Sequence, residues 1–353
     1  MVGLAIVEGF EHVCCRYRVR AFVPALAAAG VSLRIEALRR DPAGRIAQLL
    51  GAGRYDFVLL QRKLLPGWQL GLLKTRARRL VFDFDDAVLY RDSYDPRGPH
   101  CPRRAARFAR TVRAADLVLA GNDFLADCAR RAGALADRVR VLPTCIDTER
   151  LRPIDREPRS SGLTLAWIGS SSTLQGLLRE RPLLEHLGRS LPGLTLRLIC
   201  DRFAELGPLR VEAVPWSEAG EAQALATADV GISLIPDDLW SRGKCGLKVL
   251  QYLACGLPVV ANPVGVHPEM VRDGINGFLP ETPDDWVRAV ARLAGDPRLR
   301  ERLGQAARGV AVQRYSVRAW SAPFVAALTG SAGRSPARPS PRPGEPALPA
   351  CGR

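Results

Sequence analysis

Two lysines stand four residues apart in a glycine-bearing segment, and their spacing could bind an anion. Lys244 and Lys248 are two of only four lysines among 51 basic residues. The loop RGKCG precedes a predicted helix from Lys248 to Cys255, whose free N–H groups and positive dipole end favour a diphosphate. Both ammonium groups could point at the same phosphates, and Gln251 on that helical face could bond a ribose hydroxyl. A solvated helix start with capping charges is the structural alternative.

A Ser/Thr loop and an acidic turn could contribute to the same site. In WIGSSSTLQG a strand precedes the loop, and Ser170, Ser171 and Ser172 could bind a diphosphate or cap the next helix. Gly265 to Glu269 predicts a turn after a buried strand. Glu269 is a candidate sugar contact, and helix capping explains it almost as well.

Three aspartates gather at the end of a predicted strand in VFDFDDAVLY, and together they need a compensating charge. Asp83, Asp85 and Asp86 would repel one another unless cations, a metal or the basic field of the protein matched them. Arg62 and Arg91 are plausible partners. An active-site or acceptor role and a structural ion-pair role both remain open.

The elements that must position these residues follow the alternating pattern of parallel, helix-covered sheets. Apolar runs such as YDFVLLQR and ADLVLAGND fill the first half, and the pattern restarts at LTLAWIGS after a Pro-rich break. A single helix is expected from about Leu177 to Arg189. Ligands of such sheets lie beyond the carboxyl ends of the strands, so the cleft between two domains is the expected site.

Length and composition indicate a globular protein with two domains. The chain has 353 residues, 47% hydrophobic and 25% charged, and its net charge is +15. Such a charge suits phosphorylated ligands or anionic surfaces, while nucleic acid is not expected because no zinc finger or aromatic-plus-basic RNA motif is visible. Nine cysteines without metal spacing suggest reduced thiols in the cytoplasm. Neither a signal peptide nor a membrane-spanning stretch is expected.

The segment from Arg242 to Phe278, RGKCGLKVLQYLACGLPVVANPVGVHPEMVRDGINGF, resembles the donor-binding segment of glycosyltransferase family 4, also called glycosyltransferase group 1. RYRVRAFVPALAAAG, ADLVLAGNDFLADCARR and VRVLPTCIDTERLRP extend the resemblance over nearly all of residues 1 to 328. The family usually has two glutamates eight residues apart. Gly243 and Gln251 stand at those positions here, so the chain resembles a divergent branch.

The resemblance implies the α/β GT-B fold, with two Rossmann-like doubly wound parallel-sheet domains facing across a cleft and a C-terminal helix crossing back to the first domain. The expected parts are an acceptor-side domain over 1–153, a nucleotide-sugar domain over 154–316, the returning helix over 317–330 and a disordered tail over 331–353. It further implies hexosyl transfer from a nucleotide-diphosphate sugar with retention and no obligatory cofactor or metal. Catalytic candidates are Asp85, Asp86 and Lys248, and acceptor-side candidates are Arg16, Arg18, Arg62 and Asp83.

The implied acceptor is a glycan, a lipid-linked glycan or a small molecule, as in bacterial polysaccharide or glycoconjugate biosynthesis. The arginines between Arg103 and Arg113 could touch an anionic membrane from the cytoplasmic side. Two alternatives stand beside this interpretation. A non-catalytic nucleotide-sugar or glycan-binding protein could keep the fold without the glutamates, and Asp83 with Asp85 resembles the nucleophile loop of haloacid-dehalogenase-like phosphatases.

Overall fold

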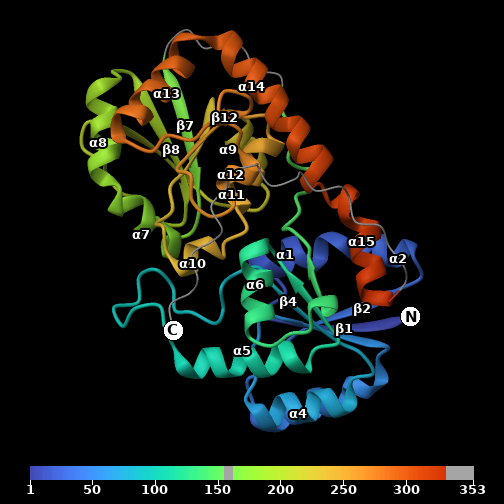
Figure 1. The fold of residues 1–353 in the computed structure, drawn as a ribbon. Coiled ribbons are helices and arrows are strands. Elements are labelled where there is room, and N and C mark those ends of the chain that lie inside the picture. Colours follow the sequence, from blue (N-terminus) through green and yellow to red (C-terminus); the bar gives the residue numbers. More distant parts are fainter. Residues whose placement is uncertain (155–161, 331–353) are drawn as a thin grey trace.

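Two parallel sheets form the framework of the chain (Figure 1). In the computed structural model, which describes residues 1–154 and 162–330, the sheets have six strands each, in the orders β2-β1-β3-β4-β5-β6 and β12-β11-β10-β7-β8-β9. The strands of the first sheet are β1 (Val2–Val7), β2 (Ser32–Ala37), β3 (Phe57–Gln61), β4 (Leu80–Phe84), β5 (Leu117–Ala120) and β6 (Val139–Val141). Those of the second are β7 (Leu163–Ile168), β8 (Leu194–Cys200), β9 (Arg210–Pro215), β10 (Val230–Ser233), β11 (Val259–Ala261) and β12 (Gly277–Phe278). The expected pair of doubly wound parallel sheets is confirmed.

The central strands are apolar on both faces because helices cover both sides of each sheet. Every residue of β3, β4 and β7 is buried. Continuous burial of this kind is typical of parallel sheets within α/β proteins. It also means that a charged residue inside such a strand must find its partner within the protein.

Some helices of the first domain begin where a polar side chain caps their free N–H groups. Asp41 caps α3 and Asn122 caps α6, each by accepting a hydrogen bond from a backbone N–H three residues on. The helices are α1 (Val13–Arg18), α2 (Val23–Ala28), α3 (Pro42–Leu50), α4 (Gly67–Arg76), α5 (Pro102–Ala114) and α6 (Asp123–Arg131). Short 3-10 turns follow at Arg20–Phe22, Gly51–Arg54 and Ala136–Arg138.

Helices of the second domain differ from the sequence prediction in one place. The single helix expected from Leu177 to Arg189 is two helices, because Pro182 removes a backbone donor and the chain turns at Glu180. The helices are α7 (Ser171–Arg179), α8 (Arg181–Ser190), α9 (Glu221–Ala226), α10 (Leu239–Arg242), α11 (Leu247–Ala254), α12 (His267–Met270), α13 (Pro283–Gly295) and α14 (Pro297–Val310). A π-helical turn, Ala311–Tyr315, ends this run.

The last described helix, α15 (Val317–Thr329), returns to the first domain and lies beside α2 (Figure 1). Ser316 caps it and pairs with Ile146 across an isolated bridge. Trp320 and Phe324 are buried in the apolar cluster of the first sheet, and the Phe324 ring stacks on Phe22 with centroids 4.3 Å apart. The predicted crossing of the C-terminal helix is confirmed, and burial of its aromatic rings accounts for it.

The two domains touch where the carboxyl ends of their sheets face each other. Asn122 donates through Nδ2 to the carbonyl oxygens of Arg242 and Lys244, at 3.3 and 3.1 Å. Farther along the cleft, the Ser93 hydroxyl lies 3.1 Å from the Asp238 carboxylate. The first sheet ends at Val141 and the second begins at Leu163, so the proposed boundary at residue 153 lies between them. Most of the predicted linker and the whole predicted tail, 331–353, fall outside the described residues.

Candidate functional site

The N-termini of α7 and α11 meet through a lysine and a threonine. Ser170 and Thr173 form a capping box at the start of α7. Gly246, at φ 64°, turns the chain into α11, and a side chain there would collide with the sulfur of Met270. Lys248 follows in the first turn, with its Nζ 3.4 Å from Thr173 Oγ1. Two segments nearly 80 residues apart in the sequence thus present helix N-termini to one space.

The side chain of Lys248 has little negative charge near it to compensate its positive charge. Its Nζ lies 5.0 Å from the centre of the Trp167 ring, and no carboxylate within ion-pair distance is found in the described residues. Burial lowers the pKa of Lys248 to about 7, and the nearby charge of Lys244 adds to the effect. The side chain is half-buried, and an anionic ligand beside it would favour the protonated form by supplying the missing negative charge.

The other members of the predicted donor loop are placed as follows. Ser170 and Ser172 share a hydroxyl contact of 2.8 Å, and the backbone N–H of Ser171 donates to the Asp201 carboxylate at 2.6 Å. One donor of the α7 terminus is therefore already used by a carboxylate. Glu269 is exposed on the short helix α12, and the expected turn is present at Gly265 and Val266, directly before that helix.

Lys244 faces the first domain rather than the Thr173 side of the cleft. Its Nζ lies 3.8 Å from the Asp86 carboxylate and 5.3 Å from the centre of the Trp240 ring. The two lysines are therefore neighbours, but each contacts a different side of the cleft. The expectation that both ammonium groups point at one phosphate group stays a prediction.

Gln251 is buried in a network that joins the two domains. Its Nε2 donates to the Tyr17 hydroxyl at 3.2 Å and lies 3.4 Å from the Glu221 carboxylate. Burial raises the pKa of Tyr17 to about 12, with Glu221 contributing, so the phenol stays protonated. The position at which the related family has a ribose-binding glutamate thus holds an amide that already has a carboxylate beside it.

Glu221 is the centre of that network, and sequence reasoning missed it. Its carboxylate accepts from Arg16 at 2.8 Å and from the Trp216 indole at 3.0 Å, and Arg150 also pairs with it. The Glu221 side chain has no exposed surface. Trp216 is close in the sequence, but both arginines come from distant segments, α1 and the stretch after β6, so the charge pairing could not be predicted from the residues around Glu221.

Gly243, the other position that lacks a family glutamate, lies against the first domain. A Cβ at residue 243 would be 2.6 Å from the Ala87 side chain and 2.9 Å from its backbone nitrogen. The thiol of the adjacent Cys245 lies 3.3 Å from the Asp85 carbonyl. The loop after β4 therefore fills the space that a glutamate at residue 243 would need.

Asp83 and Arg18 form an ion pair inside the first domain, which contradicts their assignment to the acceptor side. Neither side chain has exposed surface, and Arg18 Nε donates to the carboxylate at 3.0 Å while Nη1 donates to the Leu142 carbonyl at 2.8 Å. Burial acts to lower the pKa of Arg18, but the Asp83 carboxylate outweighs it and raises the pKa. Asp83 is also unsuited to the phosphatase alternative, because its carboxylate is enclosed and paired.

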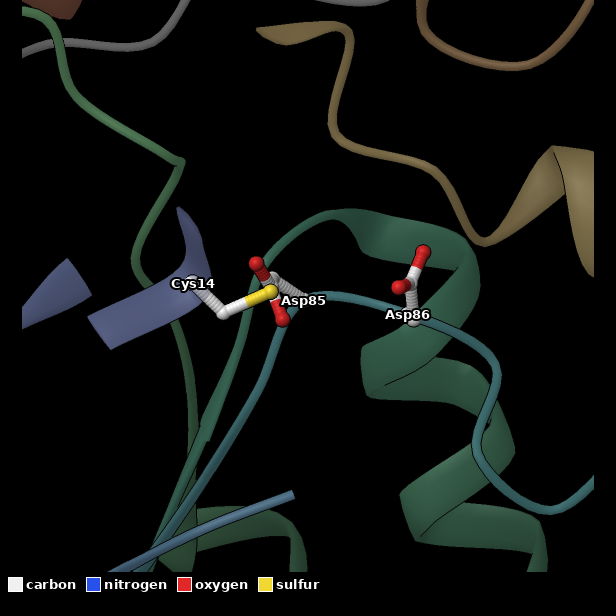
Figure 2. Close-up of side chains that lie close together, drawn as sticks. All are labelled: Cys14, Asp85 and Asp86. Carbon is white, nitrogen blue, oxygen red and sulfur yellow. The ribbon is translucent and has the colours of Figure 1, made fainter. Parts of the chain in front are cut away.

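Asp85 and Asp86 lie close to Cys14, as Figure 2 shows. Arg62 compensates both, at 3.5 Å from Asp85 and 2.6 Å from Asp86. Burial raises the pKa of the Cys14 thiol well above its ordinary value. A metal bound by these three groups would have to displace the Arg62 guanidinium and deprotonate that thiol, so the cluster is better described as an ion-pair network.

Arg62 was one of two predicted partners for these aspartates, and Arg91 was the other. The Arg91 guanidinium instead lies 3.7 Å from Asp95 and donates to the Gly98 carbonyl at 3.2 Å. Arg91 therefore orders the loop that follows β4, and its pairing with the aspartate cluster was predicted wrongly.

Comparisons with known proteins identify relatives of this chain among glycosyltransferases. Residues 237–310 match the family model of glycosyl transferases group 1. The D-inositol 3-phosphate glycosyltransferase of Actinosynnema mirum is 34% identical over 59% of this chain and 56% of its own length. The enzyme of the same name from Saccharomonospora viridis is 30% identical over 71% of this chain and 62% of its own length. The chain thus spans about three fifths of these relatives.

Solved structures cover almost the whole chain. Sucrose-phosphate synthase from Thermosynechococcus elongatus superposes with a TM-score of 0.69 and 18% identity, over 93% of this chain and 97% of that one. Anabaena HepE, solved with UDP-glucose, gives 0.64 and 17%, over 94% and 100%. The fold is GT-B, and the chain belongs to the group 1 glycosyltransferases.

Within residues 1–154 and 162–330, no helix is both long enough and apolar enough to span a membrane. The expected cytoplasmic location and the expected contact of the α5 arginines with an anionic membrane stay predictions.

Proposed function

We propose that the chain is a glycosyltransferase that moves a sugar from a nucleotide-diphosphate sugar to a glycan, lipid-linked or small-molecule acceptor. One observation carries the proposal: Lys248, a half-buried lysine without a carboxylate partner in the described residues, lies where the N-termini of α7 and α11 converge. The family match and the UDP-glucose complex of HepE support the same donor class.

In this proposal the donor diphosphate lies between the Ser170 loop and Lys248. When the bond between the sugar and the diphosphate breaks, its electron pair goes to the departing diphosphate. The ammonium group and the helix N–H groups stabilise that charge, so the step needs no obligatory metal. For a phosphate to accept from Ser171, the Asp201 carboxylate must move away from that N–H.

The remaining donor contacts are assigned to Gln251 for the ribose and to Glu269 for the sugar. Gln251 can contact a ribose only if its amide shares hydrogen bonds now made to Tyr17 and Glu221. Asp86 is the preferred carboxylate on the acceptor side, because it faces the donor segment through Lys244. We further propose that the reaction retains the anomeric configuration, as the family resemblance implies.

The proposal is tested by calorimetric titration with UDP-, GDP-, ADP- and TDP-sugars, with UDP-glucose first. The donor that binds is then incubated with a panel of acceptors, and products are identified by mass spectrometry and the anomeric coupling in NMR spectra. Binding of one donor followed by turnover with retained configuration is the expected result. Binding without turnover on any acceptor would favour the non-catalytic alternative, and an inverted product would refute retention.

A further inference from the structure

A pocket of about 550 Å³ lies beside α5, and basic side chains dominate its wall. Five cations line it, Arg62, Lys63, Arg103, Arg104 and Arg107, against a single carboxylate, that of Glu8. The donor segment Gly243 to Gly256 contributes none of its lining residues. The pocket is therefore separate from the space beside Lys248.

Two of the five cations already have anionic partners, but three do not. Lys63 pairs with Glu8, and Arg62 pairs with Asp85 and Asp86. The other three share the first turns of α5: Arg104 donates to the Tyr90 carbonyl at 2.5 Å and Arg107 to the Leu64 carbonyl at 3.5 Å. Carbonyl acceptors orient these groups without neutralising them, and no ion pair within residues 1–154 and 162–330 includes Arg103, Arg104 or Arg107.

The position of these three arginines at the start of α5 also favours a bound anion. They begin a 13-residue helix, whose N-terminal end carries partial positive charge. Like charges one turn apart repel one another, so an anion between them would lower the energy of the arrangement. Guanidinium groups match the geometry of phosphate and carboxylate oxygens.

Trp240 connects this pocket to the donor segment. Its ring forms the wall contributed by the second domain, and Lys244 lies over that ring, 5.3 Å from its centre. Lys244 also faces Asp86, which pairs with Arg62 on the pocket wall. A molecule held in the pocket would thus lie next to the cleft where sugar transfer is proposed.

We propose that this pocket binds the phosphate group of a small phosphorylated acceptor, with Arg103, Arg104 and Arg107 as the anion-binding side chains. The inference rests on the proposed transferase function, since it names the class of acceptor for that site. Arg103 and Arg104 are exposed and Arg107 is half-buried, so the pocket is open to solvent on the side of α5. Its concave wall, with Trp240 on one side, fits a compact anion better than a flat lipid surface.

Cys101 reports on occupancy of the pocket. It caps α5 and lines the pocket, and it is the one free cysteine within the described part of the chain that is not buried. The nearby backbone N–H of Arg104 lowers the pKa of the thiol, which favours alkylation at neutral pH. Mass spectrometry of the peptide containing Cys101 resolves its alkylation from that of other cysteines.

The test measures the rate at which iodoacetamide modifies Cys101 in the full-length protein. Glucose 6-phosphate and glycerol 3-phosphate should slow the reaction to a saturating limit, whereas glucose and glycerol should not. Arg103→Gln combined with Arg107→Gln should weaken the protection about tenfold or more, as expected for lost charge-assisted contacts. Arg110→Gln is the matched control, because Arg110 is exposed on the same helix but does not line the pocket.

Several results would overturn the inference. These are equal protection by the unphosphorylated compounds, no protection by either phosphate, or an equal loss of protection in Arg110→Gln. Protection only by phosphatidylcholine vesicles that contain phosphatidylglycerol would assign the arginines to a membrane surface instead. Circular dichroism of each variant checks folding, and Arg103→Lys tests the charge with little change in shape.

The outcome is distinguishable from that of the proposed function. An anion bound beside Lys248 would not shield Cys101, so protection should persist in Lys248→Met. If sugar phosphates protect Cys101 but no nucleotide sugar binds, the anion pocket stands and the transferase proposal fails. If a donor binds and turns over while no phosphate protects, the reverse holds.

Discussion

Replacing Lys248 with methionine should stabilise the protein and weaken donor binding at the same time. The fall of the Lys248 pKa from 10.5 to about 7 corresponds to an upper limit of about 5 kcal/mol for keeping the ammonium group in the fold. Water reaching the side chain reduces that figure. We therefore expect Lys248→Met to raise the free energy of unfolding at pH 7 by about 1 to 3 kcal/mol. Loss of the charge-assisted contact should weaken the binding of a nucleotide sugar by about 1.5 to 3 kcal/mol.

The pH dependence of stability and of donor affinity tests the same reasoning. Between pH 7 and 10.5 the unfolded state binds more protons at this lysine than the folded state, so wild-type stability should rise with pH across that range. The Lys248→Met variant should lack that contribution, and its advantage should shrink as pH increases. Donor affinity should fall above about pH 7 in the wild type, because the empty site loses the proton that a bound diphosphate favours.

Urea unfolding and calorimetry from pH 6 to 9.5 measure both effects. Lys74→Met is the matched control: Lys74 lies on α4, and its Nζ is 2.6 Å from an oxygen of Asp116, so its removal should neither stabilise the protein nor change donor affinity. A Lys248→Met variant that is less stable at every pH, or that binds the donor as tightly as the wild type, would refute the reasoning.

Three further predictions concern buried contacts of the framework. Glu221→Gln should lower the free energy of unfolding by about 2 to 4 kcal/mol, since Arg16 and Arg150 lose their enclosed carboxylate and keep only the partly exposed Glu218; unchanged urea midpoints would contradict it. Asp83→Asn should cost about 3 to 5 kcal/mol by leaving Arg18 buried and unpaired, and adding Arg18→Met should recover part of that loss in the same assay. Truncation before Trp320 should cost solubility because it uncovers the apolar face under α15, and a soluble, active truncated protein would argue against that packing.

Much of the fold follows from patterns that are local in the sequence. Runs such as Phe57–Leu60 are apolar because helices cover both faces of the sheet, and such short runs between longer helical segments indicate the strands. Pro182 could have revealed the break between α7 and α8, since it occupies the second position of a new helix and not the interior of one.

The site was harder to predict because its partners are distant in the sequence. Alternation along β4 places Phe82 and Phe84 in the cluster with Phe108, and Asp83 on the opposite side. Nothing in the sequence indicates that the partner of Asp83 on that side is Arg18, which is 65 residues away in the chain. The same limit applies to Glu221. The Lys248 segment was recognisable because a loop, a helix start and a rare residue type coincide within a few positions.

The contact between Gly243 and Ala87 links two positions that no local rule would connect. With a Cβ at residue 243 only 2.6 Å from the Ala87 side chain, any larger residue at 243 requires the loop after β4 to shift first. In mutational terms the two positions are epistatic, and the order of changes matters. Because that Cβ would also lie 2.9 Å from the backbone nitrogen of Ala87, trimming the side chain at residue 87 would not be enough, and Gly243→Glu should be damaging unless the backbone of the loop moves with it.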